Sequence, residues 1–227
     1  MRLFEDGAGR LVKREVADLR RAVEKYLVKA EDVGAWRTWL DAFYADLRDV
    51  APDYLQATLL ALAEQVAAGV AEEQDAAVDG EALADFVDGY LNTFAGGYVA
   101  SHNRQLAALT DEGEVDGVPV AERIGGRLDG WEQTEAKRQA LGNAYEGLNA
   151  LTVAAYTVVG VRYLMWMATG ESCEFCRSMS GRIVGIDGFF VQAGGSVNGL
   201  DGGVLSVSRN KRHGPIHEGC DCVVIAV

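Results

Sequence analysis

The stretch VVGVRYLMWMATGESCEFCRSMSGRIVGI, residues 158–186, marks the point where the chain changes from helix-forming to strand-forming sequence. Between residues 161 and 167 apolar side chains occupy both alternating sets of positions, which is typical of a strand buried at least partly on both faces. A second apolar run, GRIVGI, follows soon after a C-x-x-C pair. The stretch therefore predicts two strands joined by a short connection that carries two cysteines.

The sequence before this stretch is helical in character almost throughout. Apolar residues from Val12 to Val33 are spaced alternately by four and by three positions, which forms a narrow, heptad-like stripe. Further apolar stripes lie within residues 36–47, 55–70 and 83–98. We interpret the first stripe as a helix packed on its own domain, with docking onto a partner helix as the alternative. His102 is expected to be an ordinary polar residue at the edge of the last helix.

A linker is predicted at TDEGEVDGVP, residues 110–119, which is rich in charge, glycine and proline. It would separate a helical region, residues 1–110, from a second domain, residues 119–227. The second domain begins with helical sequence that several glycines are expected to cut into shorter pieces, and it ends with strands at GVLSVS and CVVIAV. Seven of the nineteen residues from 185 to 203 are glycine, so a loop is expected there. The fold class predicted is α+β: a helical N-terminal half followed by helix and a small antiparallel sheet.

Charge and hydropathy exclude several classes of protein. The net charge is −13, and residues 38–103 contain twelve acidic residues against the single basic Arg48, which disfavours binding to nucleic acid or anionic lipid. The first ten residues lack the apolar core of a secretory signal, and the longest uncharged stretch, residues 147–161, is too short to span a bilayer. We therefore expect a protein made in a reducing cytoplasm, where clustered cysteines indicate a metal more than a disulfide.

All four cysteines and two of the three histidines lie after residue 170. After the C-x-x-C pair, the segment PIHEGCDC, residues 215–222, adds three further candidates; together the candidate metal ligands are Cys173, Cys176, His217, Cys220 and Cys222. C-x-x-C and H-x-x-C spacings each turn two ligand atoms toward one point, and tetrahedral zinc needs four ligands. One of the last three candidates is thus spare, and the sequence leaves open which one.

A structural zinc ion would stabilise this region more than a disulfide could. Structural zinc contributes on the order of 10 to 16 kcal/mol of apparent binding free energy, whereas a disulfide that closes a loop of this size contributes roughly 3 to 4 kcal/mol. We predict a zinc knuckle that staples the C-terminal domain, with free thiols or oxidised pairs as alternatives. A deaminase-like catalytic zinc is disfavoured because the C-x-x-C precedes the histidine. A thioredoxin-like redox pair is disfavoured because the chain returns quickly to a strand through Gly181.

The spacing of these residues resembles the C-terminal signature of phage minor head proteins related to Mu protein F and to the SPP1 head morphogenesis protein. The residues that match are Cys173, Cys176, Gly181, Pro215, His217, Cys220 and Cys222. The upstream sequence WEQTEAKRQALGNA is similar to the family's Thr-Glu helix through Thr134, Glu135 and Asn143. The resemblance covers about residues 119–227. This chain departs from the family at Glu218, Gly219 and Asp221, which make the motif acidic, so no DNA-contacting role is transferred to it.

The resemblance implies a non-enzymatic virion component that is present in few copies and associates with the portal vertex. It would act in head morphogenesis or in the handling of packaged DNA, inside the capsid or at the portal, after synthesis in the host cytoplasm. The implied partners are the portal protein and the major capsid protein, with packaged DNA as a weakly supported third. No membrane and no small-molecule substrate are implied.

Two other functions remain as alternatives from the sequence. An effector enzyme resembling ADP-ribosyltransferases would use a Glu-x-Glu pair, and Glu112-Gly113-Glu114 fits that string, although it lies in the acidic linker. A nucleic-acid-binding zinc module would use the basic cluster of SRNKRHG, which contains Arg209, Lys211 and Arg212. The net negative charge counts against the second alternative, and a solvated loop explains these three residues as well.

Overall fold

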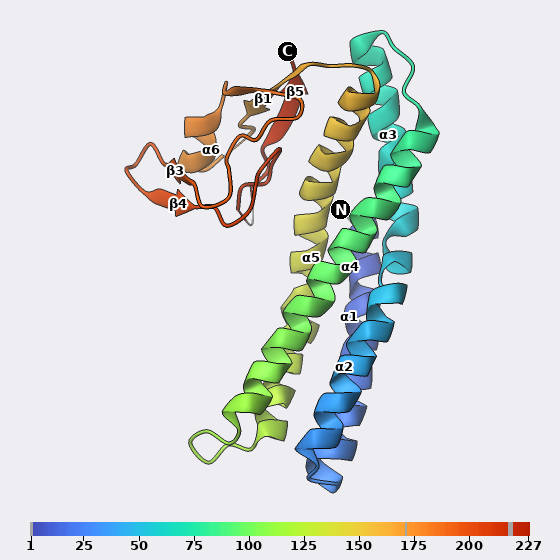
Figure 1. The fold of residues 1–227 in the computed structure, drawn as a ribbon, viewed down its shortest axis with the longest axis vertical. Coiled ribbons are helices and arrows are strands. Elements are labelled where there is room, and N and C mark those ends of the chain that lie inside the picture. Colours follow the sequence, from blue (N-terminus) through green and yellow to red (C-terminus); the bar gives the residue numbers. More distant parts are fainter. Residues whose placement is uncertain (1, 171, 218–219) are drawn as a thin grey trace. The chain divides into compact units, whose positions relative to one another are not determined.

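The computed structural model describes residues 2–170, 172–217 and 220–227, and of Leu141 and Asn143 it describes only the backbone. Contacts divide the chain into two units: unit 1 comprises Met1–Thr58 and Asp88–Ala140, and unit 2 comprises Leu59–Val87 and Leu141–Val227. The helices precede a small antiparallel sheet near the C-terminus (Figure 1), and this confirms the predicted α+β fold class. The two units differ from the two regions expected on either side of residues 110–119, because three of the described helices contribute residues to both units.

Five α-helices and two shorter helical turns cover residues 2–158. They are α1 (Arg2–Ala22), the π-helical turn η1 (Val23–Lys29), α2 (Val33–Val50), the 3-10 turn η2 (Pro52–Tyr54), α3 (Gln56–Gln74), α4 (Gly80–Glu112) and α5 (Val120–Val158). Asp32 caps α2 by accepting a hydrogen bond from the backbone N–H of Ala35 at 2.9 Å. Pro52 stands at the start of η2, where its missing N–H costs no helical hydrogen bond.

The expectation that glycines cut residues 120–158 into shorter helices is wrong. Helix α5 runs through all of its glycines without a break. A glycine inside a helix costs only about 1 kcal/mol relative to alanine, and α5 is otherwise rich in strong helix formers such as Ala, Leu, Glu and Arg. The cost of each glycine is therefore offset over the length of the helix.

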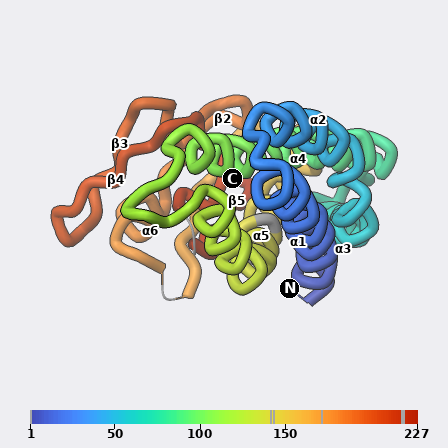
Figure 2. Tube along the Cα trace, turned by 90° about the horizontal axis from the view of Figure 1, so that it is seen from below, coloured from blue at the N-terminus to red at the C-terminus, as the bar shows by residue number. Residues whose placement is uncertain are grey.

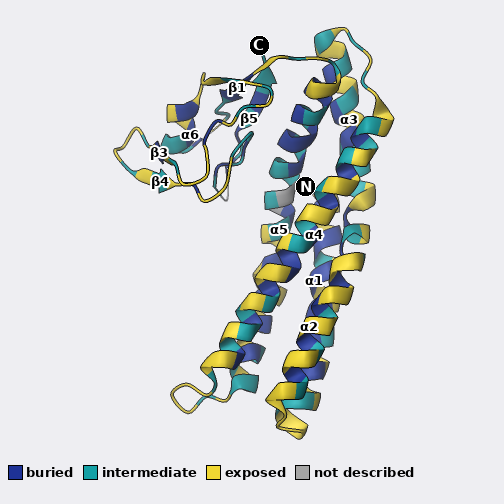
Figure 3. Ribbon diagram, in the orientation of Figure 1, coloured by how far each residue is buried: buried dark blue, intermediate teal, exposed yellow. Residues whose placement is uncertain are grey.

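The first apolar stripe is buried inside unit 1 from Val12 to Val23, whereas Ala30 and Val33 at its end are exposed. Val12, Val16, Leu19 and Val23 are each at most 8% exposed and belong to one core cluster with side chains of α2, α4 and α5. Along α1 and α2, buried residues alternate with exposed ones so that one side of each helix is covered (Figure 3). This confirms the interpretation that the stripe packs on its own domain.

Helix α1 and η2 approach each other closely within unit 1 at Gly7. A Cβ built on Gly7 would lie 2.5 Å from the backbone carbonyl oxygen of Tyr54 and 3.0 Å from a methyl group of Leu55. No real Cβ contact is that short, so only glycine allows α1 to pack here without a shift of the backbone. Gly9, two residues further on, faces a nearest neighbour 4.0 Å away, the Cβ of Ala136.

A buried polar network crosses the core of unit 1, and the expectation that His102 lies at a helix edge is wrong. His102 is 1% exposed; its Nδ1 lies 2.9 Å from Oε1 of Glu15 and its Nε2 lies 3.2 Å from Oε1 of Glu135. Tyr44 donates a hydrogen bond to Glu15 at 2.8 Å, and Tyr98 donates a second one. An ionised carboxylate only accepts hydrogen bonds, so with both glutamates ionised both ring nitrogens of His102 would act as donors, as in a protonated imidazole.

The electrostatics of the network agree with this assignment. Burial alone lowers the pKa of His102, but the hydrogen bonds to Glu135 and Glu15 outweigh it and raise the pKa above its ordinary value. Burial alone raises the pKa of Glu135, but hydrogen bonds from His102, Arg138 and Gln139 lower it to about 2. The ring of His102 also stacks on Trp131, with the ring centroids 4.0 Å apart. The raised pKa of His102 and the lowered pKa of Glu135 both favour an ion pair between these two residues.

The segment expected as a linker is the turn between α4 and α5. Val115 and Val118 form an antiparallel bridge within it, and Asp116 and Gly117 adopt positive φ angles. Arg123 donates a 2.8 Å hydrogen bond to the carbonyl of Gly113 and pairs with Glu112. In unit 1, residues 88–112 of α4 and residues 120–140 of α5 are thus joined by an ordered turn (Figures 1 and 2).

Unit 2 contains the β-structure. The central strand β1 (Tyr163–Met167) pairs antiparallel with β2 (Ile183–Gly185) on one side and with β5 (Val223–Ala226) on the other. A separate hairpin joins β3 (Ser196–Asn198) to β4 (Val204–Ser206). The strands predicted at 161–167, GRIVGI, GVLSVS and CVVIAV are present. The glycine-rich segment is not loop throughout, because it contains β3.

Candidate metal centre

The C-x-x-C pair is positioned by the short helix α6 (Glu174–Met179), which follows β1 (Figure 1). Cys173 is the N-cap of α6, and its Sγ accepts a hydrogen bond from the backbone N–H of Cys176 at 3.4 Å. Cys176 lies in the first turn, 1% exposed. Capping thus turns both sulfur atoms toward the same end of α6.

The connection that carries this pair lies between antiparallel strands. β1 and β2 pair Tyr163 with Gly185 and Met165 with Ile183. A thioredoxin-like C-x-x-C instead opens a helix inside a parallel βαβ unit. The strands on either side of α6 are antiparallel, so α6 does not belong to a parallel βαβ unit.

The closing segment brings the other three candidates to the same place. Cys220 is 5% exposed, and Cys222 is fully buried directly before β5, whose first residue pairs with Met167 of β1. His217 precedes them; the departures at Glu218 and Gly219 lie outside the described residues. All five candidates predicted from the sequence therefore lie around the ends of β1, α6 and β5.

Their ligand atoms form two groups that share Cys176. The first group is Cys173, Cys176 and His217, and the second is Cys176, Cys220 and Cys222; within each group all ligand atoms lie within 4.8 Å of one another. The Nε2 of His217 lies 2.8 Å from Sγ of Cys173 and 4.0 Å from Sγ of Cys176. The Sγ atoms of Cys176 and Cys220 are 3.1 Å apart. This cluster of thiols and an imidazole could bind a metal ion.

The donor set fits zinc, whereas the separations of the ligand atoms are not those of a bound ion. Ligand atoms in a tetrahedral zinc site lie about 3.5 to 3.8 Å from one another, as follows from Zn–S bonds of about 2.3 Å and Zn–N bonds of about 2.0 to 2.1 Å. Of the three separations given above, 2.8 and 3.1 Å lie below that range and 4.0 Å lies above it, so these ligand atoms would shift on binding zinc. Soft thiolates with an imidazole are the donors that tetrahedral zinc takes. All four cysteines are free thiols, so none is committed to a disulfide.

The pKa values of two of the thiols, Cys173 and Cys220, are lowered. Burial raises the pKa of Cys173, but hydrogen bonds with His217 and with the N–H of Cys176 outweigh burial and lower it. The hydrogen bond between Cys176 and Cys220 lowers the pKa of Cys220 and raises that of Cys176, so the two sulfur atoms share a proton. A metal ion replaces such protons, because the ligand is the thiolate.

Asn149 fixes the backbone next to Cys222, and the sequence analysis missed it. Its Nδ2 donates to the carbonyl oxygen of Cys222 at 2.9 Å, and its Oδ1 accepts from the N–H of Val224 at 3.1 Å. Asn149 lies on α5 in unit 2 and is 1% exposed. The sequence does place an asparagine within the apolar run LNALTVAAY. Because a buried amide needs hydrogen-bond partners, this position could have been predicted to contact another segment.

Further polar contacts connect residues 169 and 172, which precede α6, with residues 221 and 222, which precede β5. Thr169 donates a 2.8 Å hydrogen bond to the carbonyl of Asp221, and Ser172 donates to the carbonyl of Thr169. The Oγ of Ser172 is 4.0 Å from Sγ of Cys222. These contacts tie the segment before α6 to the segment before β5.

The basic cluster near the site is occupied by contacts within the chain. Arg209 pairs with Glu146 at 3.2 Å, Lys211 donates to the carbonyl of Pro215 at 2.8 Å, and Arg212 donates to the carbonyl of Ile186 at 2.7 Å. These contacts support the interpretation of a loop whose charges are balanced locally.

The remaining residues singled out from the sequence lie in unit 1 or outside the described side chains. Glu112, of the Glu-x-Glu string, pairs with Arg123 at the end of α4. Thr134 donates to the carbonyl of Gly130 within α5, and Glu135 belongs to the buried network with His102. The side chain of Asn143 lies outside the description.

Comparison with known proteins found no matching family model, no matching curated protein and no matching solved structure. Among the described helices, none has the length and apolar character needed to cross a membrane. The function proposed below therefore rests on the residues of the site.

Proposed function

We propose that this protein is a phage minor head protein of the Mu F-like kind, a non-enzymatic virion component that acts in head morphogenesis at the portal vertex. The observation that carries the proposal is the meeting of C-x-x-C and P-x-H-x-x-C-x-C in one cluster. Those two motifs are the ones on which the resemblance to that family rests. Their side chains converge on a common point, as a shared structural role for both motifs requires.

In this proposal the cluster holds a structural zinc ion. The linked contacts run from Cys173 to His217, from His217 to Cys176 and from Cys176 to Cys220, which assigns these four residues as ligands. Cys220 and Cys222 both group with Cys176, and we take Cys222 as the spare thiol because Cys220 has the short contact to Sγ of Cys176, at 3.1 Å. Four protein ligands close a tetrahedral site and leave no position for water or substrate, which is the arrangement of structural zinc.

The zinc would make the C-terminal module of unit 2 rigid. Three strands of three residues and a short helix bury little apolar surface of their own, and glycine-rich connections lose much backbone entropy on ordering. A metal held by α6 and by the segment before β5 offsets that cost. A rigid module is consistent with a protein that binds other virion proteins and does not catalyse a reaction.

The partners in this proposal are the portal protein and the major capsid protein of the same phage, with the helices of the N-terminal region as the docking part. Packaged DNA is a less favoured partner, because the net charge is −13 and the three basic residues near the site contact the chain itself. The location that follows is the capsid interior or the portal vertex.

Co-purification tests the proposal. The full chain is co-expressed with the tagged portal protein of the same phage, and the fraction retained after washing is measured together with the yield of filled heads when the gene is deleted. We expect the wild type to be retained and the deletion to lower the yield of filled heads. If the portal protein retains none of the chain and filled heads form normally without it, the proposal is wrong.

A further inference from the structure

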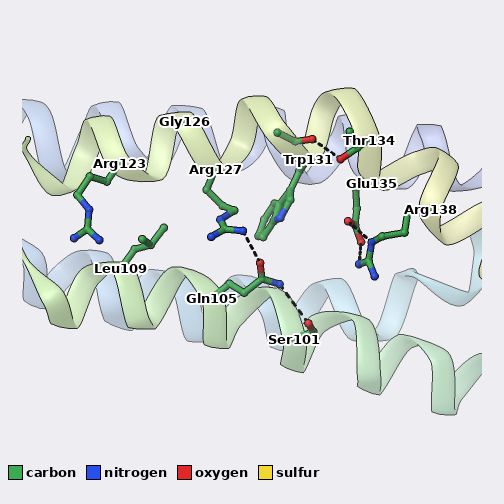
Figure 4. Close-up of a pocket in the computed structure, with 11 residues that line it drawn as sticks. Ser101, Gln105, Leu109, Arg123, Gly126, Arg127, Trp131, Thr134, Glu135 and Arg138 are labelled. Atoms are coloured by element: carbon green, nitrogen blue, oxygen red, sulfur yellow. Dashed lines mark hydrogen bonds and ion pairs between the residues drawn. The ribbon is translucent and has the colours of Figure 1, made fainter. Parts of the chain in front are cut away.

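A polar groove of about 740 Å³ lies along unit 1 between α4 and α5 (Figure 4). Its walls are formed from α4 by Ser101 and Gln105 and from α5 by Arg123, Arg127 and Arg138. Figure 4 shows Arg123 and Arg127 extending from α5 toward α4. Three guanidinium groups along one groove are notable in a chain with a net charge of −13.

Two of the three arginines already have carboxylate partners. Arg123 pairs with Glu112, and Arg138 pairs with Glu135, whose oxygens also face His102. Arg127 contacts only the side-chain oxygen of Gln105, at 3.3 Å, and has no carboxylate partner within the described part of the chain. Arg127 therefore presents a positive charge to the groove that the fold does not balance.

The floor of the groove is open where α5 carries glycine. A Cβ built on Gly126 or on Gly130 would meet no atom within 4 Å. Both glycines line the groove, one on each side of Arg127 along the helix. The absence of side chains at these two positions makes room for a ligand directly beside the guanidinium group of Arg127.

Hydroxyl and amide groups complete the set of donors on the opposite wall. Gln105 donates from Nε2 to the Oγ of Ser101 at 3.3 Å, which uses an acceptor site of the hydroxyl and leaves its proton available. Ser101 is exposed, and within the described contacts its hydroxyl donates to no acceptor. A ligand in the groove would meet Arg127 on one side and the Ser101 hydroxyl on the other.

We propose that this groove binds a small organic phosphate, with the phosphate group on Arg127. A guanidinium group pairs with phosphate through two parallel hydrogen bonds. A phosphate monoester presents three acceptor oxygens, so donors from α4 and α5 can engage it together, whereas a carboxylate presents two. The volume lies within the range of small-molecule sites, roughly 300 to 1,000 Å³. A polynucleotide is disfavoured by the negative charge of the chain. The proposal is independent of the function proposed above.

Isothermal titration calorimetry at low salt, with ribose 5-phosphate, inorganic phosphate and malonate as probes, tests this inference. We expect ribose 5-phosphate to bind at one site and Arg127→Gln to weaken it at least about tenfold, equivalent to about 1.4 kcal/mol. Arg104→Gln is the matched control, because Arg104 is an exposed arginine of α4 in the same unit that does not line the groove. It should leave the affinity unchanged.

A second variant separates binding from folding. Gly130→Leu places a side chain in the groove and replaces glycine by a better helix former, so it should abolish binding without lowering the midpoint of thermal unfolding. The inference is overturned if ribose 5-phosphate does not bind, or if Arg104→Gln weakens binding as much as Arg127→Gln does. Malonate binding as tightly as the phosphate ester would overturn the choice of phosphate. A single-stranded oligonucleotide that binds more tightly than the ester would overturn the choice of a small ligand.

Discussion

The Nε2 atom of His217 lies 2.8 Å from the Sγ atom of Cys173, although 44 positions separate the two residues in the chain. Cys173 caps α6 after the first strand of the sheet, and His217 belongs to the segment that leads into the last strand. β1 and β5 pair directly, so the contact joins two segments that the sheet already brings together. A metal at this point would lock the sheet where its first and last strands meet.

The spare ligand can be identified by comparing two buried cysteines. Cys220→Ala should lose the metal, because Sγ of Cys220 lies 3.1 Å from Sγ of Cys176 in the linked set of contacts. Cys222→Ala should retain one equivalent, because the short contact to Sγ of Cys176 is made by Cys220, although Cys222 belongs to the same group of ligand atoms. Both substitutions remove one buried sulfur atom, so each is the control of the other, and elemental analysis of the purified variants measures the difference. Loss of metal from Cys222→Ala alone would reverse the assignment.

Asn149 should be as important for unit 2 as a core residue. Asn149→Ala leaves the carbonyl of Cys222 and the N–H of Val224 without partners in a buried place. We expect the free energy of unfolding of unit 2 to fall by roughly 2 to 4 kcal/mol, measured by urea unfolding followed by tryptophan fluorescence. Thr152→Ala is the control, because Thr152 bonds only to Leu148 of its own helix. Equal stability of the two variants would contradict this role for Asn149.

The buried network should give unit 1 an optimum of stability in mild acid. The pKa of Glu135 is about 2 in the fold against an ordinary 4.5, so its contribution is complete above pH 4.5 and is lost as the pH falls toward 2. The pKa of His102 is raised above its ordinary 6.5, so its contribution is complete below pH 6.5 and is lost as the pH rises through the raised value. Stability should be greatest between about pH 4.5 and 6.5.

Thermal unfolding measured across pH by circular dichroism checks this expectation, with His102→Gln as the comparison. Gln has no charge to titrate near neutral pH, so the loss of stability on the alkaline side should vanish in this variant. The loss on the acidic side should become smaller, because Glu135 keeps Arg138 and Gln139 but loses His102. The same fall above pH 6.5 in both proteins would assign the effect to other groups.

Two glycines of α1 should respond in opposite directions to the same substitution. Gly7→Ala should lower the free energy of unfolding of unit 1 by about 1 to 3 kcal/mol, because its Cβ would lie 2.5 Å from the carbonyl oxygen of Tyr54. Gly9→Ala should raise it by about 0.5 to 1 kcal/mol, since its Cβ has room and alanine favours the helix. Chemical denaturation measures both. A stabilising Gly7→Ala would mean that α1 and η2 are further apart than the structure places them.

The cysteines and histidine that the structure brings together could be singled out from the sequence because their signal is local. Cysteine and histidine at two- and one-residue spacings point to a shared ligand without knowledge of the fold. Most strands were predictable in the same way, from short apolar runs bounded by glycine and serine. The spare cysteine was not predictable, because the choice depends on distances between segments more than forty residues apart.

Asn149, His102 and the groove depend on partners distant in sequence. Asn149 is important because β5 folds against it, and His102 is buried because Glu15 and Glu135 come to both of its nitrogens. The glycines of α5 suggested breaks, yet Gly126 and Gly130 instead open the groove beside Arg127. In each case the sequence shows a polar residue or a glycine where an apolar helix former would be expected. Only the packing of distant segments shows which contact or opening that residue provides.

The metal content of the full chain tests the central claim most directly. Protein purified without added zinc is analysed for metals, beside the Cys176→Ser variant, which removes the one residue common to both ligand groups. We expect one equivalent of zinc in the wild type, none in the variant, and loss of ordered structure in the C-terminal module of the variant. A wild-type protein that contains no metal and folds as well as it does with zinc added would contradict the account.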